Sequence, residues 1–203
     1  MSRRPAARDV GRAEVLERAA TAIAEHGYHG TSMRDLASAT GRALASFYHL
    51  FGSKDEILYE LQLRAFEELL ASAAVVIAAP STSASPDERL HRFIANHVRY
   101  FVEQPAVMRV LVQEASTLPP VRRSVIRTLK QRYYAVGEKL LADVVSASGA
   151  ELDRAEIERS TYCMFGMLNW IYGWYEPGIH GSPEVLAKTI HSMTLTGIRR
   201  SNS

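Results

Sequence analysis

Residues 27–58 of the chain read GYHGTSMRDLASATGRALASFYHLFGSKDEIL. Glycines break this stretch into short segments, and residues 33–40 and 44–51 each have the apolar spacing of a short helix. Gly41 lies in the few residues between these two helices. Two short helices joined by a tight turn that contains a glycine are typical of a helix-turn-helix. The stretch therefore predicts a helix-turn-helix.

The rest of the chain also has helical rather than alternating periodicity, and no segment predicts a strand. Residues 80–86 read PSTSASP, which we interpret as a surface loop between helices rather than a flexible domain tether. The expected fold class is all-α. About nine helices are expected, at residues 11–26, 33–40, 44–51, 54–79, 86–103, 106–116, 121–148, 154–175 and 183–199.

The composition is that of an ordinary globular protein, with 203 residues of which 47% are hydrophobic and 23% charged. Cys163 is the only cysteine, which excludes a disulfide within the chain and a cysteine-only zinc site. No stretch is apolar for long enough to span a bilayer, and no apolar signal segment follows the basic N-terminal arm. We therefore expect a cytoplasmic protein that does not contact a membrane.

The formal net charge of +2 does not by itself indicate a nucleic-acid ligand, and residues 1–60 hold as many acidic as basic side chains. The placement of the charges is more informative than their sum. Basic residues gather in an N-terminal arm and in a later run, at Arg3, Arg4, Arg8 and Arg12, and at Arg122, Arg123, Arg127, Lys130, Arg132 and Lys139.

Residues 27–58 closely resemble the N-terminal DNA-binding domain of transcriptional regulators of the tetracycline-repressor (TetR) family. The resemblance, which covers about the first quarter of the chain, implies a DNA-binding domain at residues 1–56 and a helical ligand-binding and dimerisation domain at 57–203. The matched residues are Gly27-Tyr28, Thr31-Ser32, Arg34, Leu36-Ala37, Gly41, Ser46, Phe47, Tyr48, His49, Phe51 and Ser53-Lys54.

A recognition helix places its N-terminal residues against base edges and its flanks against phosphates. Arg34 has donors for guanine in the major groove, and Leu44 has a methyl surface for thymine. The resemblance implies phosphate contacts for Tyr48, His49 and Lys54. This chain differs from many family members at Ala43, where they carry Ser or Thr, and at Leu44. The expected DNA-binding residues are Arg34, Arg42, Ala43, Leu44, Ser46, Tyr48, His49 and Lys54.

The two long C-terminal helices are expected to form a dimer interface, as the resemblance implies. The helix at 154–175 is apolar on several faces, and a small domain rarely buries such a helix alone. The alternative interpretation is the core of a monomer. The expected interface residues are Phe165, Leu168, Ile171, Tyr175, Leu186, Ile190 and Met193.

Residues 167–178 read MLNWIYGWYEPG and resemble a branch of the family that represses fatty-acid and steroid breakdown and releases DNA on binding an acyl-CoA thioester. Such a ligand needs an apolar tunnel with a cationic mouth. One interpretation of the basic run at residues 122–139 is that it forms this mouth, and the other is a solvated helix face. Glu114 is either a polar group in the pocket or a surface residue. The expected ligand-binding residues are Phe93, Tyr100, Phe101, Met108, Leu111, Glu114, Arg123, Arg127, Trp170 and Trp174.

Enzymatic motifs such as GxSxG, HExxH, a P-loop or GxGxxG are absent, and the seven histidines have no metal-ligand spacing. We therefore expect no catalysis, cofactor or metal, but a homodimeric repressor that leaves a palindromic operator when an effector binds. Two alternatives remain: an effector that is a hydrophobic drug or aromatic compound, and a helical protein-interaction module or enzyme that does not bind DNA.

Overall fold

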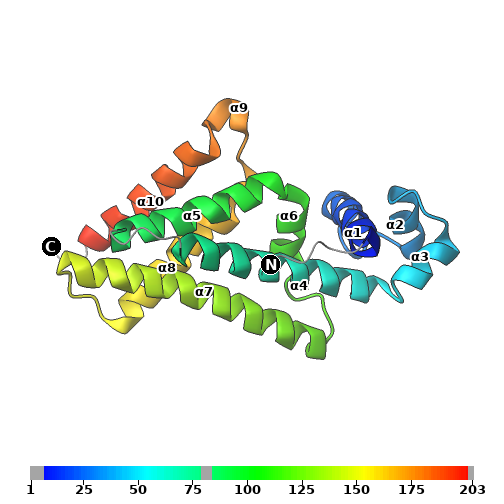
Figure 1. The fold of residues 1–203 in the computed structure, drawn as a ribbon, viewed down its shortest axis with the longest axis horizontal. Helices are drawn as coiled ribbons and strands as arrows, with labels where there is room; N and C mark the ends of the chain where they lie inside the picture. Colours follow the sequence, from blue (N-terminus) through cyan, green and yellow to red (C-terminus); the bar gives the residue numbers. More distant parts are fainter. Residues whose placement is uncertain (1–6, 79–83, 201–203) are drawn as a thin grey trace. The chain divides into compact units, whose positions relative to one another are not determined.

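The computed structural model describes residues 7–78 and 84–200, and within these ranges it contains helices and no strands (Figure 1). The predicted all-α fold class is therefore confirmed for the part of the chain described. The helices are α1 (Ala7–His26), α2 (Met33–Ala39), α3 (Leu44–Leu50), α4 (Lys54–Ala78), α5 (Pro86–Glu103), α6 (Pro105–Gln113), α7 (Pro120–Ser148), α8 (Arg154–Asn169), the 3-10 turn η1 (Ile171–Gly173), α9 (Pro177–His180) and α10 (Pro183–Arg200).

The chain forms two compact units, and neither is continuous in sequence. The first consists of Met1–Ala65 and Ala106–Arg127, and the second of Phe66–Pro105 and Thr128–Ser203. The first unit therefore holds α1–α3 together with α6, and the second holds α5 and α8–α10. The expected boundary at residue 56 is not tested by this division and stays a prediction.

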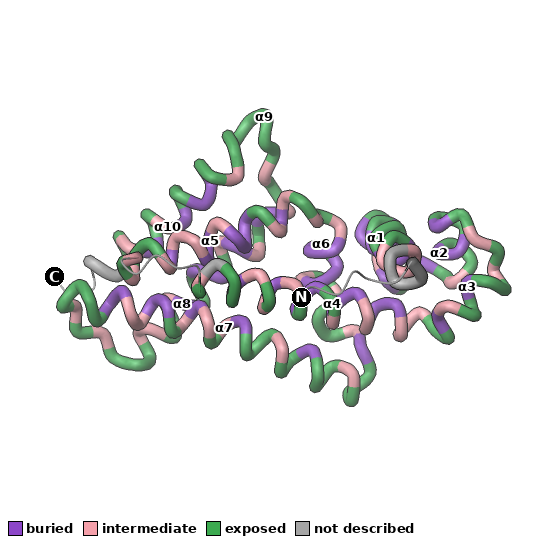
Figure 2. The backbone as a smooth tube through the Cα atoms, in the orientation of Figure 1, coloured by how far each residue is buried: buried purple, intermediate pink, exposed green. Residues whose placement is uncertain are grey.

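The core of the helix-turn-helix forms where one apolar stripe of α1 packs against α2, which in turn packs against α3. Leu36 of α2, Phe47 of α3 and Phe51 after it have no exposed surface, and the buried side chains of α1 are small or branched. Figure 2 shows buried stretches of backbone, in purple, within this part of the first unit. Burying such side chains stabilises the fold by about 1.5–3 kcal/mol each. The buried positions of α1 are Val15, Leu16, Ala19, Ala20, Ala22, Ile23 and Ala24.

Local backbone chemistry sets the ends of these short helices. The Ser32 side chain accepts a hydrogen bond from the Asp35 N–H, and the Asp35 carboxylate accepts one from the Ser32 N–H, which completes a capping box at the start of α2. Gly41 has φ +70°, a left-handed conformation that glycine adopts without strain, and the chain can therefore reverse between α2 and α3. Ala43 begins α3 without any side-chain cap.

The second unit is built around α5, which packs against α10 and contacts α8. The buried face of α5 carries Phe93 and Phe101, and α8 contributes Phe165 to the same interior. Gly137 of α7 is needed for this packing, because a Cβ there would lie 2.9 Å from the Phe165 ring. The rings of Phe165 and Tyr134 stack with centroids 3.9 Å apart.

The prediction of a helix at 154–175 is wrong about where that helix ends. α8 ends at Asn169, Trp170 caps it with φ −90° and ψ −1°, and a single 3-10 turn follows. Pro177 then forces the preceding residue, Glu176, into extended backbone. Aromatic side chains at helical spacing continued past this point and concealed the break.

Candidate nucleic-acid interface

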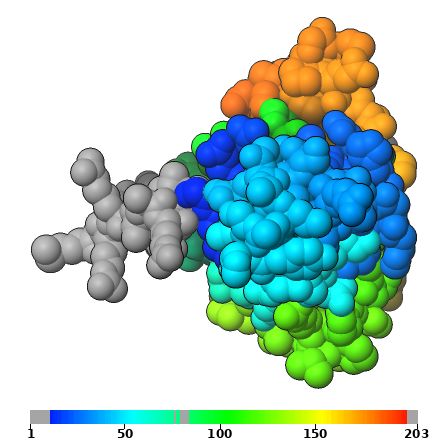
Figure 3. Space-filling model, turned by 90° about the vertical axis from the view of Figure 1, so that its right-hand side faces the viewer, coloured from blue at the N-terminus to red at the C-terminus, as the bar shows by residue number. Residues whose placement is uncertain are grey.

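The exposed face of α2 and α3 carries most of the expected DNA-binding residues. Figure 3 looks onto this part of the first unit, with the blue and cyan surfaces of α2 and α3 toward the viewer. Tyr48 is 50% exposed, although it is a large aromatic residue. An exposed tyrosine beside an exposed histidine presents two side-chain donors to phosphate oxygens. The exposed members of the expected set are Arg34, Ala43, Ser46, Tyr48 and His49.

The turn between the two helices positions the start of α3. The N–H of Gly41 donates to the Ser38 carbonyl at 3.0 Å, and the N–H of Arg42 donates to the Ala37 carbonyl at 2.9 Å. Arg42 and Leu44 are half-buried at this turn. The turn therefore holds these two residues at the entry to α3, where a recognition helix contacts base edges.

Lys54, expected to contact a phosphate, has two protein partners in the structure. Its ammonium donates to the carbonyl oxygens of Tyr28, at 2.7 Å, and Thr31, at 2.8 Å. The same ammonium lies 4.3 Å from the centroid of the Tyr28 ring. Lys54 therefore fastens the loop between α1 and α2 to the start of α4, a structural role that the sequence did not indicate.

Arg12, which belongs to the basic N-terminal arm in the sequence, also has protein partners in the structure. Its guanidinium makes two hydrogen bonds to the Glu60 carboxylate, at 2.8 and 2.7 Å, and one to the Leu50 carbonyl at 2.6 Å. It also lies 4.3 Å from the Phe51 ring centroid, and the Glu60 bond raises the pKa of Arg12. Arg12 therefore ties α1 to α3 and α4. Arg3 and Arg4 lie outside the described residues.

A further network connects the helix-turn-helix to the end of α6 and was not predicted. The Glu114 carboxylate accepts the backbone N–H of Tyr28 at 3.2 Å and the Thr117 hydroxyl at 2.6 Å. The Tyr28 hydroxyl donates to Asp55, and burial together with this bond raises the pKa of Tyr28. The Gln62 amide donates to the Glu114 carbonyl at 3.0 Å. Glu114 thus serves structure within the first unit.

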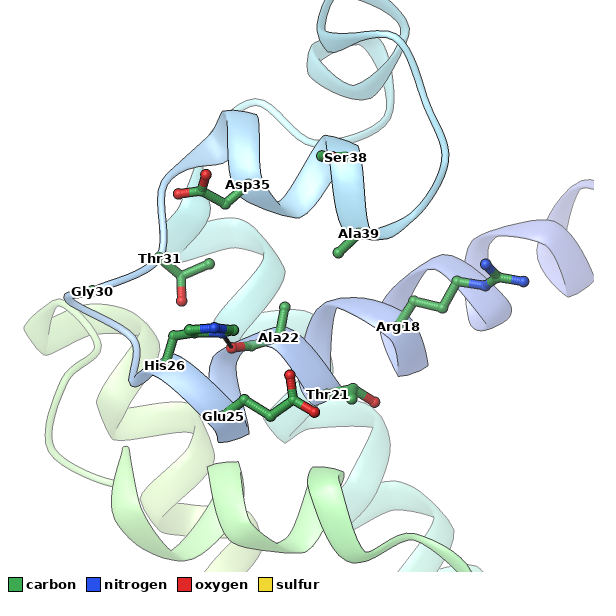
Figure 4. Close-up of a pocket in the computed structure, with 10 residues that line it drawn as sticks. All are labelled: Arg18, Thr21, Ala22, Glu25, His26, Gly30, Thr31, Asp35, Ser38 and Ala39. Atoms are coloured by element: carbon green, nitrogen blue, oxygen red, sulfur yellow. Dashed lines mark hydrogen bonds between the residues drawn. The ribbon is translucent and has the colours of Figure 1, made fainter.

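The first unit also contains a surface hollow of about 670 Å³ between α1 and α2 (Figure 4). Arg18 on its wall already pairs with Glu14, at 2.9 Å, and Asp35 belongs to the capping box. The His26 ring lies beside the Ala22 carbonyl at 3.1 Å. Because these groups have protein partners, we assign the hollow no ligand. Its walls are Arg18, Thr21, Ala22, Glu25, His26, Gly30, Thr31, Asp35, Ser38 and Ala39.

The expected ligand-binding residues are divided between the two units. In the second unit Phe93 and Phe101 are buried, and the Tyr100 hydroxyl donates to Glu68 at 2.8 Å. Trp170 and Trp174 of the same unit are instead exposed. The first unit holds the other five, namely Met108 and Leu111, which are buried, Glu114, and the exposed Arg123 and Arg127.

The expected dimer residues are mostly buried within their own chain. Tyr175 is half-buried with its hydroxyl on the Gly181 carbonyl at 2.8 Å, and Met193 is 59% exposed. The buried ones support α8 and α10 from the inside: Phe165, Leu168, Ile171, Leu186 and Ile190. The same region presents other large apolar side chains to solvent: Tyr162, Trp170, Trp174, Ile179, Val185 and Met193.

Across residues 7–78 and 84–200 no three His, Cys, Asp or Glu side chains are grouped as metal ligands. None of the helices in these ranges has the length and apolar character needed to cross a membrane.

Two family descriptions match the chain. Residues 15–61 match bacterial regulatory proteins of the tetR family, and residues 83–198 match the tetracyclin repressor-like C-terminal domain. The second match alone covers more than half of the chain.

Relatives match over nearly the whole length. The HTH-type transcriptional repressor KstR2 of Rhodococcus jostii is 25% identical over 193 residues, which cover 92% of this chain and 90% of KstR2. The regulator PfmR of Thermus thermophilus has a TM-score of 0.78 at 33% identity, covering 90% of this chain and 97% of PfmR. AibR, solved with isovaleryl coenzyme A and operator DNA, has a TM-score of 0.77 at 23% identity, with coverages of 90% and 97%.

Proposed function

Because this chain belongs to the tetR family of bacterial regulatory proteins, we propose that it is a homodimeric repressor that binds a palindromic operator and leaves it when an effector binds. The regulators of this family are not enzymes. The observation that carries the proposal is the exposed face of α2 and α3, where polar side chains face solvent above a fully buried core. Because a protein that binds operator DNA works where that DNA is, we propose that it is cytoplasmic.

Within the DNA-binding domain, proposed at residues 1–56, Arg34 and the start of α3 contact bases. Arg34 is exposed near the beginning of α2, and Ser46 is exposed in the first turn of α3. Tyr48 and His49 donate to phosphates on the flank of the same helix. Lys54 supports this surface through the α1–α2 loop that it holds.

The remaining residues, 57–203, form the effector and dimerisation domain. We place the dimer contact on the exposed apolar side chains of α8 and α10, in particular Tyr162, Val185 and Met193. Large apolar side chains that gather on a surface mark interaction sites, and a two-fold dimer matches the two half-sites of a palindrome.

We propose an acyl-CoA thioester as the effector. Isovaleryl coenzyme A bound to AibR, whose fold is similar, supports this ligand class. The exposed Lys130 and Arg132 of α7, which belong to the basic run and to the same unit as α5, supply charge for CoA phosphates. An aromatic compound or hydrophobic drug is the second candidate, which the buried rings of α5 favour. In both cases the effector must bind the DNA-incompetent state more tightly.

A gel-shift series on the DNA upstream of the protein's own gene tests operator binding. Arg34→Ala should weaken binding by about tenfold, whereas Arg109→Ala removes the same charge from the exposed face of α6 and should leave binding unchanged. Failure of the wild-type protein to bind any operator fragment would refute the repressor. Equal losses for both variants would assign the effect of Arg34 to bulk charge.

Acyl-CoA thioesters of increasing chain length are then added to the operator complex, each beside its free acid. Release by a thioester but not by the acid supports the proposed effector class. Indifference to all of them, with release by aromatic compounds, supports the second candidate.

Sedimentation of the DNA-free protein tests the dimer. Val185→Glu with Met193→Glu should give monomers, because each places a carboxylate in the apolar contact. Val121→Glu, at an exposed position of α7, is the control and should remain dimeric. Monomeric wild-type protein would overturn the interface.

A further inference from the structure

The second unit contains a histidine whose surroundings are almost entirely aromatic. His97 of α5 is 2% exposed, and its ring lies 5.2 Å from Phe101 and 6.1 Å from Phe165, measured between centroids. Phe93 and Tyr133 close the same cluster, with centroids 5.2 Å apart. We call these residues the aromatic cluster: Phe93, His97, Phe101, Tyr133 and Phe165. Its members come from α5, α7 and α8, all within one unit.

One nitrogen of the His97 ring has a partner and the other does not. Nδ1 lies 3.1 Å from the Tyr133 hydroxyl oxygen, whereas Nε2 is buried without a hydrogen-bond partner among the described residues. Buried polar atoms in native proteins are nearly always hydrogen-bonded, and an exception requires an explanation.

Counting donors and acceptors identifies the group that Nε2 lacks. If the Tyr133 hydroxyl donates to Nδ1, Nε2 carries the proton and a single donor is left without an acceptor. If Nδ1 donates to Tyr133 instead, both the Tyr133 proton and the Nε2 lone pair are left without partners in the described structure. The first arrangement leaves fewer buried groups unsatisfied. His97 therefore presents an N–H donor to the interior.

The charge state limits the partner further. Burial lowers the pKa of His97 to about 3, so the ring is neutral near pH 7. A neutral donor whose ring contacts three aromatic rings cannot compensate for burying an ionised carboxylate, because a buried charge needs several partners. A neutral oxygen on an otherwise apolar chain has the matching chemistry.

We propose that the Nε2–H of His97 donates a hydrogen bond to the carbonyl oxygen of the effector's acyl group within the aromatic cluster. This inference rests on the proposed function, because it assigns the residue that recognises the thioester. It explains why a thioester would be bound and the free acid rejected. Tyr133 acts as a positioning residue that fixes the tautomer of His97.

The test compares two ligands that differ only in the carbonyl. Calorimetry on the DNA-free protein measures an acyl-CoA and the S-alkyl-CoA thioether of the same chain length, in which CH2 replaces C=O. Wild-type protein should bind the thioester about tenfold more tightly, because the thioether leaves the buried donor unsatisfied. His97→Phe should bind both within about twofold.

Two further variants keep the test decisive. His91→Phe makes the same change on the same helix outside the aromatic cluster and should retain the preference. Tyr133→Phe keeps the ring and removes one hydroxyl, so it remains informative if His97→Phe does not fold; its preference should fall to about threefold. In nitrogen-15 spectra of the wild type, the thioester should shift the His97 Nε2 resonance and the thioether should not.

The outcomes separate the two levels of the proposal. If wild-type protein binds thioester and thioether equally, His97 is not the recognition residue, while the effector class stands. A preference retained by His97→Phe leads to the same conclusion. If neither CoA compound binds while operator binding is intact, the effector class fails and the role of His97 fails with it.

Discussion

The helix-turn-helix and the aromatic cluster use polar side chains in opposite ways. Along α2 and α3 the polar groups face solvent, and caps and turns within a few residues fix the backbone that carries them. In the aromatic cluster the polar pair is inside, and its partners, His97 and Tyr133, lie 36 residues apart in sequence. The first arrangement can therefore be found from local sequence, whereas the second exists only once the helices pack.

The largest effect expected from this contrast is a pH dependence that belongs to the interior histidine. Unfolded His97 has a pKa near its ordinary value, about 6.5, and the folded value is about 3. The unfolded state therefore binds the proton first, and the folded state loses about 1.4 kcal/mol per pH unit below 6.5. Between pH 6.5 and 4.5 the wild type should lose roughly 2–2.5 kcal/mol more than His97→Phe.

Urea unfolding at a series of pH values measures this difference. His29→Gln removes an exposed histidine from the other unit and should keep the acid slope. Parallel curves for wild type and His97→Phe would mean that the ring is hydrated rather than buried.

Arg12→Ala tests whether the basic arm contains a structural residue. The change removes three hydrogen bonds and the contact with Phe51, so the free energy of unfolding should fall by about 2 kcal/mol. Arg18→Ala breaks only an exposed pair with Glu14 and should cost about 0.4 kcal/mol. Equal shifts of the denaturant midpoint in the two variants would mean that the Arg12–Glu60 pair stabilises the fold no more than the exposed Arg18–Glu14 pair does.

Lys54→Met and Tyr48→Phe separate support of the DNA surface from contact with DNA. Lys54→Met removes a charged donor from two carbonyls and should lower the free energy of unfolding by about 1.5 kcal/mol. Tyr48→Phe should change it by less than about 0.5 kcal/mol and weaken operator binding a fewfold. Thermal unfolding and gel shifts on the same samples measure both effects for both variants. The opposite result would assign DNA contact to Lys54 and structural support to Tyr48.

The smallest effect concerns the uncapped start of α3. Ala43→Ser supplies a side-chain oxygen where the backbone is already extended, so the protein should gain about 1 kcal/mol of stability. Ala45→Ser, within the same short helix and also exposed, is the control and should not stabilise. A gain for Ala45→Ser alone would contradict the cap.

Sequence reasoning worked where short-range rules decide the structure. Glycines and apolar spacing located α2 and α3, and the predicted start at residue 154 agrees with α8, because the signals that set these helix ends lie within a few residues of them. It could not assign partners to charged groups. The charge of Arg12 and Lys54 is visible in the sequence, but the carboxylate and carbonyls that bind them come from other elements.

The apolar pattern of a helix likewise does not say what covers its apolar face. Phe165, Leu168 and Ile171 were predicted at a dimer interface, and the structure buries them in their own chain. Helical spacing says that a face is covered but does not distinguish a neighbouring helix from a second subunit. The orphaned nitrogen of His97 has no signature in the sequence.

The discontinuity of the first unit has a consequence for how the protein is made. The Tyr28 N–H and the Gln62 amide find their acceptors on Glu114, 86 and 52 residues further along the chain. On the ribosome, all of α5 is synthesised before those acceptors exist, so the DNA-binding end is made first but completed late. A fragment that stops at residue 65 would therefore lack these bonds, and its helix-turn-helix would be held by fewer contacts than in the full-length repressor.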